Sequence, residues 1–440
     1  MGAAPTAIAI LIITLYLAIT KPQGLGIGWS ALGGAIFALG TDVVTLKDIP
    51  VVWGMVGNAT FTLVALIIIA LVLESSGFFR WLAINITRWG SGWGRLLFML
   101  VVLLGALLTA MLTSYGTVLF LTPVVIEIVL ELGFAAKGAI AFIIAIGFIA
   151  DTASLALPVS NLVNAIAADY FHISFLRYVL VMVPCNVVAI ASSLGVLWFY
   201  FDRYIPTNYS LASLKTSSDR LIRDPLVCRW SFPILGLLLI SYFFAQPLGI
   251  PVSFIASIGA IIMLALAGRW FGGGSGVSST LQILQQAPWQ AILFSLGMYI
   301  VVMGLINVGL TPKVTHILEQ LPRWGITVAT TGTGFLAMLL SSVMNHLPAV
   351  LVNNIAIKNT AGVDPAIREA MVYANIIGCD IGAKLTPIGS LSTLLWLEVL
   401  ARKGIRINWF QYFSFSIVLT IPVLFISLLI LAIWLPWLIA

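Results

Sequence analysis

Residues 147–161 read GFIADTASLALPVSN, and residues 378–390 read GCDIGAKLTPIGS. In each stretch an aspartate follows an apolar run, and a proline comes shortly after it. The series of matching positions keeps one spacing of 229 residues: Asp151, Pro158 and Leu162 recur as Asp380, Pro387 and Leu391. Because proline cannot donate a backbone hydrogen bond, each stretch predicts a helix that is broken next to a buried charge. The ordered matches indicate an internal duplication.

The composition places the whole chain in a membrane. Of its 440 residues, 61% are hydrophobic and 8% are charged, whereas a soluble domain has about 25% charged residues. Apolar runs recur from Ala7 to Leu438, which leaves no room for a soluble enzymatic domain. The first run, 7–20, lacks a preceding basic residue, so we interpret it as a retained helix and not as a signal peptide.

The pattern of apolar runs predicts an all-α fold with two repeats, 1–201 and 230–440, joined by a polar linker, 202–229. Each repeat has three helices, an interrupted segment, a broken helix and a last helix. The first repeat is expected to have helices near 5–20, 26–46 and 56–76, an interrupted segment 95–132, a broken helix 138–168 and a last helix 175–201. The second is expected at 231–246, 250–268, 289–309, 326–358, 369–400 and 409–439.

The interrupted segments are either pairs of short spans or re-entrant hairpins, and we favour hairpins because a helix breaker flanks a polar tip in both repeats. Five transmembrane helices and one hairpin per repeat would invert the second repeat relative to the first, as in secondary transporters. Fourteen Lys and Arg residues then share the linker's side and six lie opposite. The excess predicts a cytoplasmic linker and outward-facing termini.

The polar residues at the four interruptions are the candidate solute ligands. Broken helices point free backbone groups and dipole ends at a central cavity. The side chains there are mostly neutral hydroxyls and amides, with one imidazole, and they suit an uncharged polyhydroxy solute or an ion bound by oxygen atoms. Small polar residues also help ordinary helix packing. The candidates are Ser114, Ser160, Asn161, Asn345, His346, Thr386, Gly389 and Ser390.

Asp151, Asp380 and Lys384 are the candidate proton-coupling residues, since each lies inside an apolar stretch. A charge at the centre of a membrane helix costs about 2.5–3.5 kcal/mol, so it is usually functional or paired. Asp380 and Lys384 are four residues apart, which predicts an ion pair on one helix face. Asp151 lacks such a neighbour and is the stronger candidate to exchange protons. The alternative is a static ion pair that holds the bundle together.

Other chemistries find little support in the sequence. The three cysteines, Cys185, Cys228 and Cys379, are too scattered for a disulfide framework or a thiolate cage. The chain contains no phosphate-binding loop motif, so we expect no ATP hydrolysis by this chain. We predict neither a metal site nor a cofactor, and the net charge of +6 reports membrane orientation and not nucleic-acid binding.

Several strings resemble the arsenical pump membrane protein family, of the ArsB type, within the ion transporter superfamily. The resemblance covers nearly the whole chain and implies proton-driven export of arsenite and antimonite across a bacterial inner membrane, optionally with a soluble arsenical-pump ATPase on the cytoplasmic face. The strings that carry it are 24–30 (GLGIGWS), 48–53 (DIPVVW), 147–155 (GFIADTASL), 159–164 (VSNLVN), 294–299 (FSLGMY), 369–375 (EAMVYAN) and 378–390.

Two hairpin-tip positions depart from the family pattern. Ser114-Tyr115 stands where Asn-Asp is familiar, and His346 stands where Asn is familiar. A carboxylate at the first tip is therefore not essential here, unless substrate or coupling has changed. Arsenite at neutral pH is an uncharged trihydroxide that hydroxyls and amides can bind. Three thiolates would release it slowly, so we expect a cysteine-free variant to export arsenite normally.

Three alternatives stay open at this stage. The chain can be a Na⁺-coupled anion or carboxylate carrier of the same superfamily, although Lys384 alone offers a fixed positive charge near the breaks. It can also be a channel-like subunit that depends on an ATPase partner. An intramembrane enzyme is disfavoured because the acids are isolated and no Ser/His/Asp order is suggestive.

Overall fold

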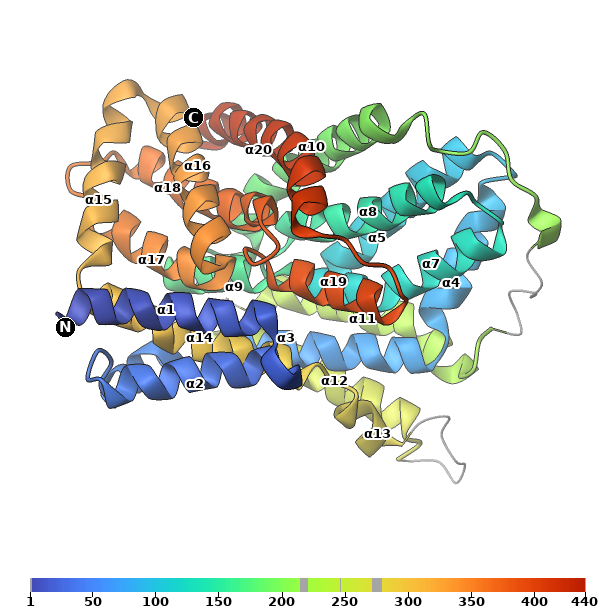
Figure 1. The fold of residues 1–440 in the computed structure, drawn as a ribbon, viewed down its shortest axis with the longest axis horizontal. Coiled ribbons are helices and arrows are strands. Elements are labelled where there is room, and N and C mark those ends of the chain that lie inside the picture. Colours follow the sequence, from blue (N-terminus) through green and yellow to red (C-terminus); the bar gives the residue numbers. More distant parts are fainter. Residues whose placement is uncertain (1, 214–220, 246, 271–278, 440) are drawn as a thin grey trace.

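The computed structural model describes residues 2–213, 221–245, 247–270 and 279–439 (Figure 1). Within these residues, ten helical segments are long and apolar enough to cross a membrane. The middle of the predicted linker, 214–220, lies outside the described residues, as does residue 246, the predicted end of one helix. The protein is thus a polytopic, all-helical membrane protein, as the apolar runs predict.

The described helices are distributed over both halves of the chain. The first half contains α1 (Ala3–Thr20), α2 (Ile27–Gly40), α3 (Asp48–Ser75), α4 (Phe78–Trp89), α5 (Gly94–Leu112), α6 (Ser114–Gly116), α7 (Thr122–Glu131), α8 (Ala136–Thr152), α9 (Leu162–Tyr170) and α10 (Phe175–Phe201). The second contains α11 (Pro225–Ala245), α12 (Val252–Ala267), α13 (Thr280–Gln285), α14 (Trp289–Asn307), α15 (Leu310–Gln320), α16 (Ile326–Met344), α17 (His346–Lys358), α18 (Pro365–Asp380), α19 (Leu391–Arg402) and α20 (Trp409–Ile439). The inverted relation between the halves stays a prediction.

Two short helices, α4 and α15, were not expected from the apolar runs. Each follows a glycine in the left-handed region, Gly77 with φ 84° and Gly309 with φ 91°. This conformation is open to glycine at little cost, so it lets the chain turn sharply at the end of a membrane helix. Both helices are amphipathic, and a search for continuous apolar runs overlooks such helices.

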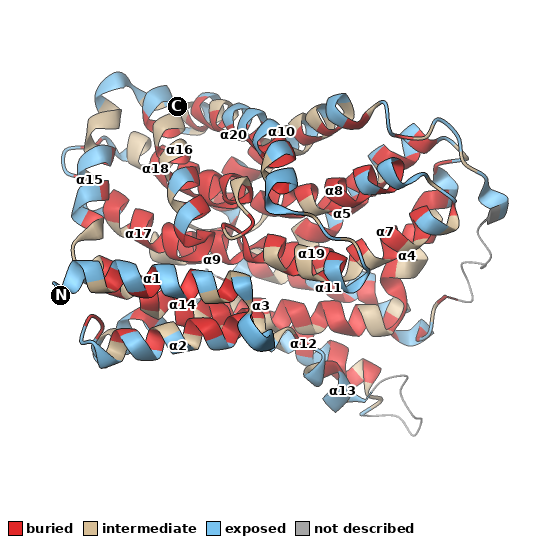
Figure 2. Ribbon diagram, in the orientation of Figure 1, coloured by how far each residue is buried: buried red, intermediate tan, exposed pale blue. Residues whose placement is uncertain are grey.

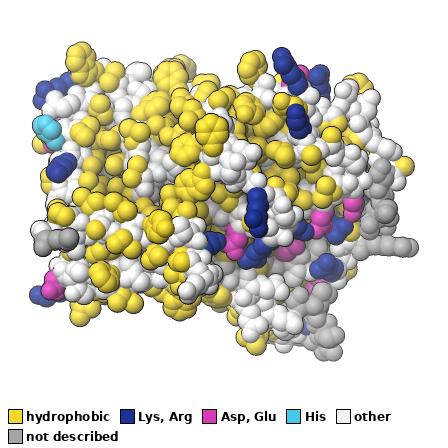
Figure 3. All heavy atoms as spheres, in the orientation of Figure 1, with side chains coloured by type: hydrophobic (Ala, Val, Ile, Leu, Met, Phe, Trp, Pro, Cys, Tyr) yellow, Lys and Arg dark blue, Asp and Glu magenta, His cyan; other side chains and the backbone are white. Residues whose placement is uncertain are grey.

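The interior of the protein lies around the broken helices. Helices α2 and α14 pack together, as do α3 with α12, α10 with α20, and α16 with α18. Figure 2 shows α9 and α17 largely buried, while α1, α2 and α20 expose one side. Hydrophobic side chains cover much of the face drawn in Figure 3. An apolar exterior of this kind fits contact with lipid; among the exposed residues are Phe199, Phe410 and Trp437, at 89%, 82% and 80%.

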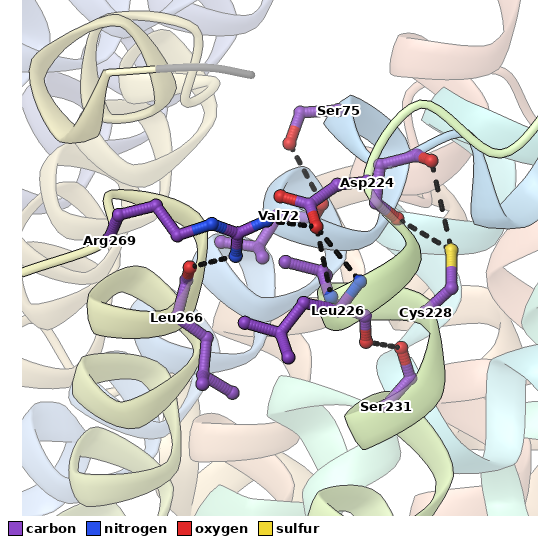
Figure 4. A network of polar contacts seen from close by, with 10 residues as sticks. Val72, Ser75, Asp224, Leu226, Cys228, Ser231, Leu266 and Arg269 are labelled. Carbon is purple, nitrogen blue, oxygen red and sulfur yellow. Dashed lines mark hydrogen bonds and ion pairs between the residues drawn. The ribbon is translucent and has the colours of Figure 1, made fainter. Parts of the chain in front are cut away.

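A polar network anchors the end of the linker to the bundle (Figure 4). The Asp224 carboxylate accepts hydrogen bonds from Arg269, at 2.8 Å, and from the backbone N–H groups of Leu226 and Val227. Helix α11 therefore begins at Pro225, earlier than the expected residue 231, because an aspartate cap and a proline in the first turn both favour a helix start.

Candidate functional site

The two breaks form where the sequence predicts them. Helix α8 ends at Thr152, two short 3₁₀ turns follow, and Asn161 caps α9 by accepting a hydrogen bond from the N–H of Val163. Helix α18 ends at Asp380, and a 3₁₀ turn followed by a second turn over residues 387–389 leads to α19. Each break leaves an aspartate at the end of one half-helix.

Each aspartate is bound by residues of the other half of the chain. Asp380 accepts a hydrogen bond from Asn161 Nδ2 at 2.6 Å and another from the Ser154 hydroxyl. Asp151 accepts hydrogen bonds from the hydroxyls of Ser392 and, at 3.4 Å, Thr393. Both carboxylates are 1% exposed. The two breaks therefore meet, and each half of the chain completes the polar environment of the other half's carboxylate.

Lys384 does not form the expected ion pair with Asp380. Its ammonium group donates to the backbone carbonyl of Phe148 at 3.0 Å and to the Thr152 hydroxyl, and it lies 4.0 Å from the centre of the Phe148 ring. The pairing prediction is wrong because α18 ends at Asp380, so the two residues do not share a continuous helix face. Lys384 is 2% exposed, and its ammonium group lies against the end of α8, next to the first break.

The tips of the two predicted hairpins also meet. The Tyr115 hydroxyl lies 3.5 Å from His346 Nε2. His346 Nδ1 lies 2.9 Å from the carbonyl oxygen of Gly389. Since that oxygen can only accept, Nδ1 carries the proton in this contact and Nε2 is left as an acceptor. Tyr115, which stands at a departure from the family pattern, thus contacts the other departing residue.

Most remaining candidates are already hydrogen-bonded within the protein. Ser160 donates to the Ala110 carbonyl at 2.7 Å, and Asn345 donates to the Ile388 carbonyl at 2.8 Å. The other contacts are those of Thr386 with the Ser342 carbonyl at 2.7 Å and of Ser390 with Ser392 at 2.6 Å. The buried Ser114 hydroxyl has no hydrogen-bond partner among the described residues. The centre is therefore closed, and a solute would have to exchange for these contacts.

Sequence reasoning missed several residues of this centre, namely Thr152, Ser154, Ser392, Thr393 and Tyr115. A signal for one of them, Thr393, exists in the repeat. At the spacing of 229 residues, Ser390 and Thr393 match Asn161 and Asn164, so the polar start of α9 points to a polar start of α19. The sequence carries no signal for the contacts between the two halves, because the spacing of residues does not show which segments meet in space.

Two sizeable cavities lie apart from the candidate residues, whereas Lys384 and Thr393 line a small void of about 10 Å³. Two cavities, of about 410 and 560 Å³, are lined by none of the eleven candidate residues. Across the described ranges, no group of three or more His, Cys, Asp or Glu residues is placed to hold a metal ion. Cys185 and Cys379 are buried and Cys228 is partly buried, and all three are free thiols.

Comparison with known proteins agrees with this architecture. The profile of the family described as "Arsenical pump membrane protein" matches residues 6–435. Arsenical pump membrane proteins of Escherichia coli and Yersinia enterocolitica are 50% and 49% identical over 96% of this chain and 97% of theirs. A putative arsenical pump membrane protein of Bacillus subtilis is 26% identical over 97% of the chain and 98% of its own length. The chain therefore belongs to the arsenical pump membrane protein family.

Proposed function

We propose that this transporter exports arsenite and antimonite from the bacterial cytoplasm in exchange for protons. Family membership supports arsenical efflux. The observation that carries the proton exchange is that each half of the chain supplies hydrogen-bond donors to the other half's carboxylate. Ser392 donates to Asp151, and Asn161 donates to Asp380. Intramembrane carboxylates at such a crossing are typical of proton relays.

The contacts of Asp380 suggest how a proton and a solute exclude each other. Asn161 donates an amide hydrogen bond to the ionised carboxylate. A hydroxyl of an uncharged trihydroxide such as arsenite can take the place of Asn161 as a donor to the ionised carboxylate. Protonation would weaken this charge-assisted bond, because a neutral acid is the poorer acceptor. The solute therefore binds Asp380 best when the proton has left.

Asp151 can act on Ser390 in the same way, through one intermediate. Ser392 donates to the Asp151 carboxylate and lies 2.6 Å from the Ser390 hydroxyl. With Asp151 ionised, Ser392 donates its hydrogen bond to the carboxylate and accepts one from Ser390, so the Ser390 oxygen is open to accept from a solute hydroxyl. A protonated Asp151 reverses these bonds, and the Ser390 oxygen then accepts from Ser392 instead of from the solute. A proton on either carboxylate thus opposes binding of the solute.

We place the linker on the cytoplasmic side and both termini outside, in keeping with the distribution of Lys and Arg. In Figure 1, α1 begins and α20 ends at the left-hand end of the molecule, and the linker joins helices at the opposite end. A soluble arsenical-pump ATPase on the cytoplasmic face is an optional partner in this proposal.

The test is arsenite flux into proteoliposomes that contain the purified protein, with an imposed pH gradient and without ATP. We expect uphill flux for the wild type and its loss in Asp151→Asn, which removes the exchangeable proton with little change in shape. Downhill flux that ignores both the gradient and the substitution would refute proton coupling and favour an ATPase-dependent subunit. A requirement for sodium would favour the Na⁺-coupled carrier instead.

A further inference from the structure

A row of polar groups leads from Asp380 to one surface of the protein. On α18, Glu369, Tyr373 and Asp380 are four and seven residues apart and therefore share one face of the helix. Glu369 forms a bidentate ion pair with Arg177 at the start of α10, with distances of 2.8 and 3.0 Å. Both side chains are about 30% exposed, at 29% and 31%, so the ion pair is reached by solvent.

Two tyrosines pack together beside this ion pair. The rings of Tyr373 and Tyr178 make an edge contact with their centres 6.0 Å apart. Tyr373 lies between Glu369 and Asp380 along α18. Tyr178 directly follows Arg177 in α10, and both tyrosines are 0% exposed. The pair of rings therefore occupies part of the buried stretch between the surface pair and Asp380.

Neither tyrosine hydroxyl has a hydrogen-bond partner among the described residues. A buried hydroxyl without a partner costs about 1–3 kcal/mol, so a pair of them in one row calls for a functional reason. Water molecules commonly bind buried groups of this kind. A hydroxyl bound to water can accept a proton on its lone pair while it releases its own proton onward.

The first half of the chain offers an internal comparison. At the spacing of 229 residues, Glu369 and Tyr373 correspond to Ile140 and Ile144 on α8, whereas Asp380 corresponds to Asp151. The acid is present in both halves, but the polar row beside it is found only on α18. Packing alone does not require this difference, since isoleucine fills the same face of α8.

We propose that Tyr373 and Tyr178 form a proton path between the Arg177–Glu369 surface pair and Asp380. A proton enters from solvent at the surface pair, passes along the two hydroxyls and their bound water, and converts the Asp380 carboxylate to the acid. Each hydroxyl gains one proton and loses one, so the tyrosines are unchanged. The other titratable groups near the path are Asp151, Lys384, Cys185 and Cys379. This inference rests on the proposed proton exchange, and the proposed orientation places the surface pair outside.

The test compares Tyr178→Phe, Tyr373→Phe and the double variant with Tyr242→Phe. Tyr242 is a matched control because it is a buried tyrosine in α11 whose hydroxyl likewise has no partner among the described residues. Two rates are measured in proteoliposomes: arsenite uptake driven by a pH gradient, and arsenite exchange without a gradient. We expect the double variant to lose about tenfold or more of the driven rate and to keep the exchange rate.

Other results would overturn the path. Driven uptake in the double variant equal to that of Tyr242→Phe would show that the hydroxyls carry no proton. An equal loss of exchange would show a general structural role. If the wild type itself shows no pH-driven uptake, the proposed proton exchange fails, and the path fails with it. If the wild type shows pH-driven uptake and the double variant shows the same uptake, only the proton path is refuted and the proton exchange stands.

Discussion

Asp151 and Asp380 are each stabilised by uncharged donors from the opposite half of the chain and not by a direct ion pair. Leaving a carboxylate unpaired at the membrane centre costs about 2.5–3.5 kcal/mol, and hydroxyl and amide donors offset part of that cost. Such donors stabilise the ionised carboxylate less strongly than a cation in direct contact would, so the carboxylate can still be protonated. This balance suits an acid that has to gain and lose a proton in each cycle.

Two asparagines three residues apart allow the coupling role of Asn161 to be separated from a structural one. Asn161 donates to the Asp380 carboxylate, whereas Asn164 donates to the backbone carbonyls of Ser154 and Leu157 at 2.7 and 3.1 Å. We expect Asn161→Ala to lower the pH-driven arsenite flux per folded protein about tenfold, and to lower stability by about 0.5–2 kcal/mol because α9 loses its cap. Asn164→Ala should lower stability by about 1–3 kcal/mol, because it leaves buried carbonyls unpaired.

The measurements for this pair are proteoliposome flux and thermal denaturation in detergent. The flux of each variant is normalised to the amount of folded protein. Equal effects of the two substitutions on both quantities would contradict the coupling role of Asn161.

At the scale of the element, the second break depends on close backbone contact. A Cβ atom at Gly389 would lie 2.1 Å from the Ala383 carbonyl oxygen and 3.1 Å from that of Ser341. The segment after α18 therefore folds back on itself and onto α16, which presents the Gly389 carbonyl to His346. Glycine is needed at this position for space and not for an unusual φ angle.

Gly389→Ala should therefore disrupt the break, at a cost of about 3 kcal/mol in stability, and abolish transport. Gly195→Ala is the matched control, because a Cβ at Gly195 in α10 meets no atom within 4 Å. In a helix that change should be neutral or stabilising by about 0.5–1 kcal/mol. Thermal denaturation and arsenite flux of both variants test this, and a fully active Gly389→Ala protein would show that the contact is dispensable.

At the scale of the whole molecule, the proposed orientation in the membrane rests on the excess of Lys and Arg on the side of the linker, and it can be tested directly. Asn208 in the linker and Ala361 between α17 and α18 are both exposed. In a cysteine-free background, we expect a membrane-impermeant maleimide to label Ala361→Cys in intact cells and Asn208→Cys only after the membrane is opened. The proposed orientation requires this because the linker side carries the excess of Lys and Arg.

The labelling experiment has an internal check. The cysteine-free protein should still export arsenite, since the three native thiols lie in different helices, α10, α11 and α18, and Cys379 already donates to Asn375. The reverse labelling pattern would show that the topology is opposite to the proposed one, and the entry of the proposed proton path would then lie on the cytoplasmic side.

Composition and local pattern were enough to predict the class of the protein, the approximate positions of most of its long helices and the two breaks. Composition, apolar run length and proline act locally, so they can be interpreted without knowing which segments meet. The buried charges could be predicted for the same reason: Asp151, Asp380 and Lys384 are among the four Asp, Glu, Lys or Arg side chains that are buried in the described part of the chain.

Only the tertiary structure decided the partners of those charges. The expected Asp380–Lys384 pair assumed a helix that continues through both residues, but α18 ends at Asp380 and Lys384 turns to Phe148 and Thr152 on α8. Ser154 and Ser392 also belong to the centre only through tertiary packing, because each contacts an aspartate more than two hundred positions away in the sequence. Local rules fix where a helix stops, whereas the packing of the two halves fixes which groups satisfy the charges left at its end.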